Sequence, residues 1–251
     1  MKSLEKLFDE YSLNARVKPA FLLMFPAIIS VIALYEPSRS WGGAAITILT
    51  SFGVIAFAAN QMSTRGNILQ EKLFKKWGGA PTTIILRHSD FRLDKNTKAR
   101  YMSKLVSLIP SFKMVSYKEE IDDPAGADET YRTAAIFLRE HTRSSTDHPL
   151  VFKENIAYGF SRNTRAFKWL GVVICLLSIA IVSTIVWSNY FNEKDGPILE
   201  LLLGIPFERA ALILLLVGSL FSWLFLVTEK WVEVRAFAYA RALYASCEHK
   251  I

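Results

Sequence analysis

Basic side chains stand beside groups that can contact a nucleotide at two places in this chain. At the first, Arg87 and His88 follow the short apolar run TIIL. Arginine offers a planar fork for phosphate, and histidine can donate a hydrogen bond or stack on a base. Upstream, Lys75 and Lys76 precede a Gly-Gly-Ala-Pro break whose amides are expected to form a small anion-binding turn before Thr82. We therefore predict phosphate or nucleic-acid contacts in this segment.

The second place is the run FKENIAYGFSRNTR, residues 152–165. On a helix, Asn155, Tyr158 and Arg162 fall at i, i+3 and i+7, which suits amide readout, base stacking and phosphate pairing on one face. Lys153 and Arg65 add cations and complete the predicted ligand-binding set. The alternative is structural, with the aromatic rings packed in a core and the final cations marking a membrane interface.

Catalytic chemistry has little support in the sequence. No Walker-type phosphate loop and no HExxH, CxxC or GxSxG motif occurs. The four histidines lack metal-ligand spacing with one another, and the two cysteines suggest no disulfide framework. We therefore expect no catalytic residues, no metal site, no cofactor and no enzyme activity.

Hydropathy predicts that the chain lies in a membrane. Of its 251 residues 51% are apolar and 21% charged. Four runs contain no Asp, Glu, Lys or Arg, and each approaches the roughly 20 residues that a helix needs to cross the hydrocarbon core. These runs are Pro19–Tyr35, Trp41–Ala59, Trp169–Trp187 and Ala210–Thr228. The predicted fold is an all-α integral membrane protein with four transmembrane helices and a helical cytoplasmic domain inserted between the second and third spans.

Lysine and arginine set the expected orientation, because loops on the cytoplasmic side carry the excess of these residues. The two short links between spans hold only Arg39, Lys194 and Arg209 of the 30 Lys and Arg residues. Both termini and the central segment are therefore expected on the cytoplasmic side of the membrane. The predicted parts are 1–59 (N-terminal arm and two spans), 60–168 (ligand-sensing domain), 169–228 (two spans) and 229–251 (cytoplasmic C-terminal helix).

The central segment has a helical pattern and a surplus of positive charge. Between Arg65 and Lys168 there are 19 Lys and Arg against 12 Asp and Glu. We expect one helix to end at Gly78-Gly79, a second to run from an Asp94 cap to Leu108, and a third to open near Asp128. A fourth, after Pro149, is expected to continue unbroken into the third span. The charge surplus fits either a solvated cytoplasmic surface or a site for a polyanion.

The motifs WGGAPTT, LRHSD, TKARY and HPLVFKENIAYGFSRN resemble those of a bacterial membrane family, the effector subunit of Hailong-type two-gene anti-phage systems. The resemblance runs from the N-terminal arm through the third span. It implies an oligomeric, tetrameric channel in the bacterial inner (plasma) membrane, whose gene partner is a nucleotidyltransferase. Single-stranded DNA oligomers made by that enzyme are expected to hold the channel closed, and their loss during infection to depolarise the cell.

The spans also suggest where a pore would lie. No ionisable residue occurs within them, which argues against a proton-coupled transporter. Thr47 and Ser51 in the second span, with Asn60 at its cytoplasmic end, are the predicted pore-lining residues; close helix packing is the alternative for such faces. Two other functions remain open, a channel opened by a cyclic nucleotide and a non-conducting scaffold that docks a protein or anionic lipid.

Overall fold

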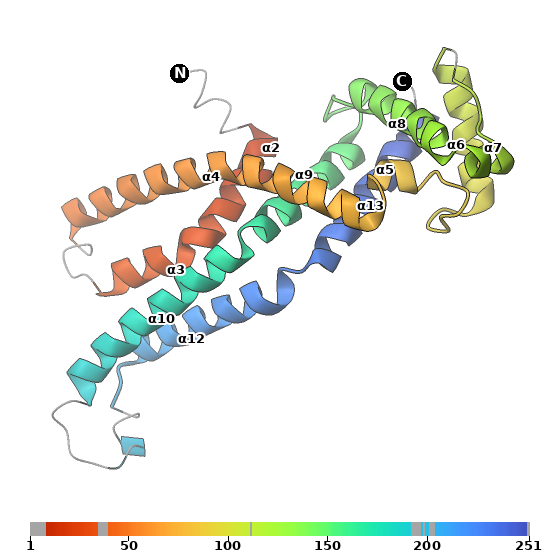
Figure 1. The fold of residues 1–251 in the computed structure, drawn as a ribbon. Coiled ribbons are helices and arrows are strands. Elements are labelled where there is room, and N and C mark those ends of the chain that lie inside the picture. The colour runs from red at the N-terminus through yellow and green to blue at the C-terminus, as the bar shows by residue number, and fades with distance from the viewer. Residues whose placement is uncertain are drawn as a thin grey trace. The chain divides into compact units, whose positions relative to one another are not determined.

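The computed structural model describes residues 9–34, 40–110, 112–191, 197, 199–200 and 204–249, and this part of the chain is helical with no strand (Figure 1). It divides into two compact units. The first unit comprises Met1–Gly66 and Arg162–Glu229, and the second comprises Asn67–Ser161 and Lys230–Ile251. The central segment and the C-terminal helix thus belong to one unit, although the sequence pattern separates them.

The first unit contains three helical stretches that are long and apolar enough to cross a membrane: Glu10–Leu34, Lys168–Tyr190 and Phe207–Leu226. The first joins α2 (Glu10–Ser12), the π-helix η1 (Leu13–Val17) and α3 (Lys18–Leu34); the second is α10 (Lys168–Tyr190); the third joins α12 (Phe207–Phe221) and the π-helix η3 (Ser222–Leu226). The predicted second span forms the first half of α4 (Trp41–Trp77). It is not among the three stretches found in the described residues, so a count of four spans remains a prediction.

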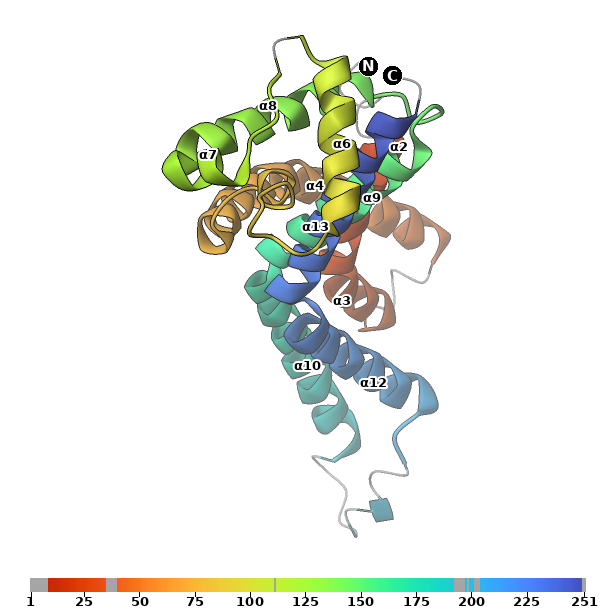
Figure 2. The same cartoon turned by 90° about the vertical axis from the view of Figure 1, so that its right-hand side faces the viewer.

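Helix α10 packs along both α3 and α12 (Figure 1, Figure 2). Val182, Val186, Leu212 and Leu216 form a buried cluster between α10 and α12. Nearer the other end of α10, a Cβ atom on Gly171 would lie 2.5 Å from the ring of Trp223. A glycine is therefore required there for the indole to approach the backbone, the kind of close packing that small residues permit in membrane helices.

The second unit contains the end of α4 and a set of shorter helices around one apolar core. The helices are α5 (Pro81–Ile84), α6 (Lys95–Leu108), α7 (Tyr117–Asp122), α8 (Pro124–His141), most of α9 (Pro149–Ala166), α13 (Glu229–Ala245) and the 3-10 turn η4 (Ser246–Glu248). Ile85, Leu105, Tyr131, Leu138 and Leu243 are almost fully buried in this core. These five residues come from four segments, since Tyr131 and Leu138 both lie on α8, so the core joins parts that are far apart in the sequence.

Local end signals account for two predicted helix boundaries. Helix α4 ends at Trp77, and Gly78 and Gly79 adopt φ values of +83° and +150° that favour glycine. Asp94 caps α6 by accepting a hydrogen bond of 2.9 Å from the amide of Thr97. Both predictions are confirmed.

The prediction that a helix opens at Asp128 is wrong. Helix α8 begins at Pro124, and Asp123 caps it by accepting a 3.0 Å hydrogen bond from the amide of Gly126. Proline at the first helical position already has the φ angle that a helix needs, which favours the earlier start. Asp128 lies within α8, where its carboxylate is available to a long-range partner.

The predicted continuous helix from Pro149 into the third span is also interrupted. Helix α9 ends at Ala166 and α10 begins at Lys168, while Phe167 between them has φ −106° and ψ 11°. The amide of Phe167 donates to the carbonyl of Thr164 at 3.1 Å, which is a tighter turn than an α-helix makes. The Phe167 side chain is buried, so its packing accompanies the break.

Candidate ligand-binding residues

Arg87 is bound to the fold from two sides. Its guanidinium donates to both carboxylate oxygens of Asp128, at 2.8 and 2.6 Å, and to the carbonyl of Gly78 at 2.8 Å. The hydrogen bond to Asp128 raises the pKa of Arg87 further above its ordinary value. A Cβ atom on Gly79 would lie 2.9 Å from the same guanidinium. The predicted phosphate fork therefore holds an internal carboxylate in this structure.

His88 belongs to the same network through its backbone. Its amide donates to both carboxylate oxygens of Glu120, at 2.9 and 3.0 Å, and its ring Nε2 lies 2.9 Å from the carbonyl of Val115. The hydroxyl of Tyr131 donates to Glu120 at 2.6 Å, and burial raises the pKa of this phenol well above its ordinary value. The LRHSD motif thus organises polar contacts within the second unit.

Two amides of the turn after α4 donate to carbonyls of the same chain. The amide of Gly79 donates to the carbonyl of Phe74 at 2.8 Å and closes the helix end. The amide of Thr83 donates to the carbonyl of Ala80 at 2.9 Å. These two amides are therefore used within the chain, and anion binding by this turn stays a prediction.

The other predicted cations and the tyrosine of the second unit differ in exposure. Lys75, Lys76 and Lys153 are exposed, and Asn155 is half-buried. Tyr158 is only 7% exposed; its hydroxyl donates to Gln70 at 2.9 Å, and its ring stacks on Tyr239 with centroids 6.3 Å apart. Its ring therefore packs in an apolar cluster instead of offering a face to a base.

Arg162 lies in the first unit, in a buried group that we name the polar junction: Ala15, Gly66, Arg162 and Asn163. The side-chain amide of Asn163 donates to the carbonyl of Ala15 at 2.6 Å, and its oxygen accepts from the Arg162 Nε atom at 3.3 Å. A Cβ atom on Gly66 would lie 1.9 Å from that oxygen. Arg162 is 8% exposed and Asn163 1%. The structure thus places Arg162 in an internal contact that helix periodicity did not predict.

Two further contacts of the first unit hold the ends of the apolar helices. The ammonium of Lys168 donates to the carbonyl of Leu224 in η3 at 2.7 Å, and Arg165 pairs with Glu229 at 3.3 Å. The guanidinium of Arg65 lies 5.6 Å from the ring centroid of Phe167. The predicted ligand residue Arg65 is exposed nevertheless, so it retains access to solvent.

The predicted pore residues all lie on α4. Because α4 is helical throughout, Thr47 and Ser51 share a face, whereas Asn60 is turned about 180° from Ser51 at roughly 100° per residue. Thr47 and Ser51 are half-buried and Asn60 is exposed. A pore lined by one face of α4 can therefore include Thr47 and Ser51, whereas Asn60 lies on the opposite face of the helix.

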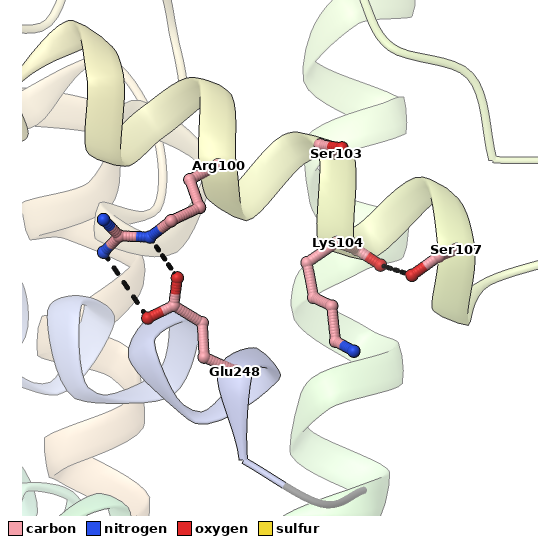
Figure 3. A pocket seen from close by; sticks show the side chains of 5 residues that line it. All are labelled: Arg100, Ser103, Lys104, Ser107 and Glu248. Atoms are coloured by element: carbon pink, nitrogen blue, oxygen red, sulfur yellow. Dashed lines mark hydrogen bonds and ion pairs between the residues drawn. The ribbon is translucent and has the colours of Figure 1, made fainter.

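A basic depression on α6 is formed by residues that were not predicted as a site from the sequence. It has a volume of about 490 Å³ and is lined by Arg100, Ser103, Lys104, Ser107 and Glu248 (Figure 3). The four α6 residues follow the i, i+3, i+4, i+7 spacing of one helix face, so their periodicity was a usable signal. Glu248 comes from η4, 148 residues after Arg100, and no local pattern indicates that it meets the α6 residues.

Comparison with known proteins adds no assignment: no protein-family model, no curated protein and no solved structure matches this chain.

Proposed function

We propose that this chain is a membrane effector of anti-phage defence, an ion channel whose basic second unit binds single-stranded DNA oligomers that keep it closed. The observation that carries the proposal is that the apolar helices and the surplus of positive charge belong to different units. The three stretches that can cross a membrane lie in the first unit. The second unit has no such stretch among its described residues and holds 19 Lys and Arg against 14 Asp and Glu.

The surface of the first unit supports insertion in lipid. Leu177, Ile181 and Leu214 are each more than half exposed, and no charged residue lies within one helical turn of any of them along the chain. In water such apolar surface is costly, whereas hydrocarbon chains solvate it without penalty. The surplus cations of the second unit suit the phosphates of a nucleic acid, and the resemblance to Hailong-type effectors names the ligand as single-stranded DNA made by a nucleotidyltransferase partner. A homo-oligomer, expected to be a tetramer, would enclose the pore.

Orientation is tested with single cysteines. Under the proposal Ser145, between α8 and α9, faces the cytoplasm, and Asn189, at the far end of α10, faces outward. In a chain whose two buried native cysteines are replaced, Asn189→Cys should react with a membrane-impermeant maleimide in intact cells and Ser145→Cys only after lysis. Labelling of Ser145→Cys in intact cells would overturn the orientation.

Gating is tested on the purified chain in planar bilayers. We expect conductance that falls when a ten-nucleotide single-stranded DNA is added to the side of the second unit. Binding should weaken steeply as salt rises, because each neutralised phosphate releases counterions. If conductance appears only when a cyclic nucleotide is added, the chain is a channel that its ligand opens. If the chain never conducts, the channel function is wrong and a non-conducting scaffold is the remaining alternative.

A further inference from the structure

The α6 depression combines groups that recognise phosphate. Tyr101, Met102 and Leu105 bury one face of α6, which leaves Arg100 and Lys104 one turn apart on the opposite face. A guanidinium fork, an ammonium and the Ser103 hydroxyl are donors that pair with phosphate oxygens. The Ser107 hydroxyl donates to the carbonyl of Lys104 at 2.7 Å (Figure 3). The Lys104 ammonium makes no hydrogen bond or ion pair with any residue that the structure describes, so one cation is available. Among the side chains drawn in Figure 3, no interaction reaches this ammonium.

Glu248 already occupies the guanidinium fork. The Nε and Nη2 atoms of Arg100 both point at its carboxylate, the latter at 3.4 Å from Oε2 (Figure 3). The paired oxygens present the same planar edge to arginine as two phosphate oxygens do. The Arg100 and Glu248 side chains are 60% and 35% exposed, and a pair so open to water contributes little to stability. An incoming anion can therefore replace this carboxylate at small cost to the fold.

The neighbouring residues hold Glu248 in position without depending on that ion pair. Ser246 and Cys247 are buried, and the Ser246 hydroxyl donates to the carbonyl of Leu243 at 2.6 Å. Burial also raises the pKa of the Cys247 thiol to about 11, so the thiol is neutral at pH 7 and adds no second negative charge. The turn thus delivers a single carboxylate to the depression.

We propose that the α6 depression is a phosphate-binding site in which Glu248 occupies Arg100 until a phosphate group of the ligand displaces it. The inference rests on the proposed function for the identity of that ligand, a single-stranded DNA. The site chemistry itself requires only a phosphate group, which inositol hexakisphosphate also supplies. Glu248 then acts as an internal competitor that sets how much ligand is needed for occupancy.

The test measures binding to the full chain in detergent micelles with two probes, a fluorescent ten-nucleotide single-stranded DNA and inositol hexakisphosphate. Arg100→Ala and Lys104→Ala should each weaken both probes by about tenfold, the size expected for a charge-assisted contact. Glu248→Gln should tighten both severalfold, because it removes the competing charge and keeps the side-chain shape. Lys95→Ala is the matched control, since Lys95 is an exposed lysine of the same helix that does not line the depression.

The outcomes separate this inference from the proposed function. The site is supported if Lys104→Ala binds both probes more weakly and Glu248→Gln binds both more tightly. If only inositol hexakisphosphate shows this pattern, the phosphate site stands and DNA as its ligand is wrong. DNA binding that is equal in wild type, Arg100→Ala and Lys104→Ala refutes the site and leaves the proposed function. Weaker binding in Glu248→Gln refutes displacement. Should Arg100→Ala fail to fold, Lys104→Ala and Glu248→Gln still decide.

Discussion

Arg87→Ala is expected to destabilise the second unit by about 2 kcal/mol, the cost of losing charge-assisted hydrogen bonds, with some reduction because a quarter of the side chain meets solvent. The variant also leaves Asp128 and the carbonyl of Gly78 without their donor. Unfolding of the detergent-purified chain, followed by tryptophan fluorescence against denaturant, measures the effect.

A double-mutant cycle distinguishes this structural role from the predicted contact with DNA. If Arg87 serves the fold, Asp128→Ala should be destabilising too, and the double variant should cost little more than the worse single one. If Arg87 instead serves the ligand, Arg87→Ala should unfold like wild type, and Asp128→Ala should strengthen DNA binding by freeing the fork. That second pattern would contradict a structural role for Arg87.

The helix ends were predictable because their signals are local. Asp94 meets Thr97 three residues later, and Gly78-Gly79 supply the positive φ that ends α4 wherever the helix packs. The partners of Arg87 were not predictable for the opposite reason. Asp128 lies 41 residues away, and only the packing of α5 on α8 brings it near. A helix pattern shows which residues share a face but not what that face meets.

Aromatic residues beside cations illustrate the same ambiguity. The order FKENIAYGFSRNTR suits both a nucleic-acid surface and a helix that packs on its neighbours. Tyr158 packs on Tyr239, and Arg162 joins Asn163 in the polar junction, so for these two residues the packing alternative describes the structure. Lys153 and Asn155 keep access to solvent on the same helix, and their predicted ligand contacts stay untested. The solvent exposure of each side chain, which depends on tertiary contacts, therefore separates the predicted ligand residues that pack inside the protein from those that solvent can reach.

Gly66→Ala is expected to destabilise the first unit by about 2–3 kcal/mol, because overpacking a buried site costs this much. The new Cβ atom would lie 1.9 Å from the Asn163 side-chain oxygen, so Asn163 must move and weaken its hydrogen bond to Ala15. Gly53→Ala is the matched control: Gly53 lies on the same helix, and a Cβ atom there would meet nothing within 4 Å. Alanine is the better helix former, so Gly53→Ala should be neutral or slightly stabilising.

The effect of Gly66→Ala should depend on Asn163. Asn163→Ala removes the obstructing oxygen, so the double variant should be no less stable than Asn163→Ala alone, even though Gly66→Ala is harmful in the wild-type background. Under the proposed function the polar junction joins segments at the ends of the apolar helices, and its distortion should change the conductance measured without DNA, in the same order as the stabilities. Thermal unfolding and bilayer recordings on the wild type, Gly66→Ala, Asn163→Ala and the double variant test both statements. Equal stability of Gly66→Ala and Gly53→Ala would show that the junction tolerates the added methyl group, and the close approach of Gly66 to Asn163 would then have no part in holding the unit together.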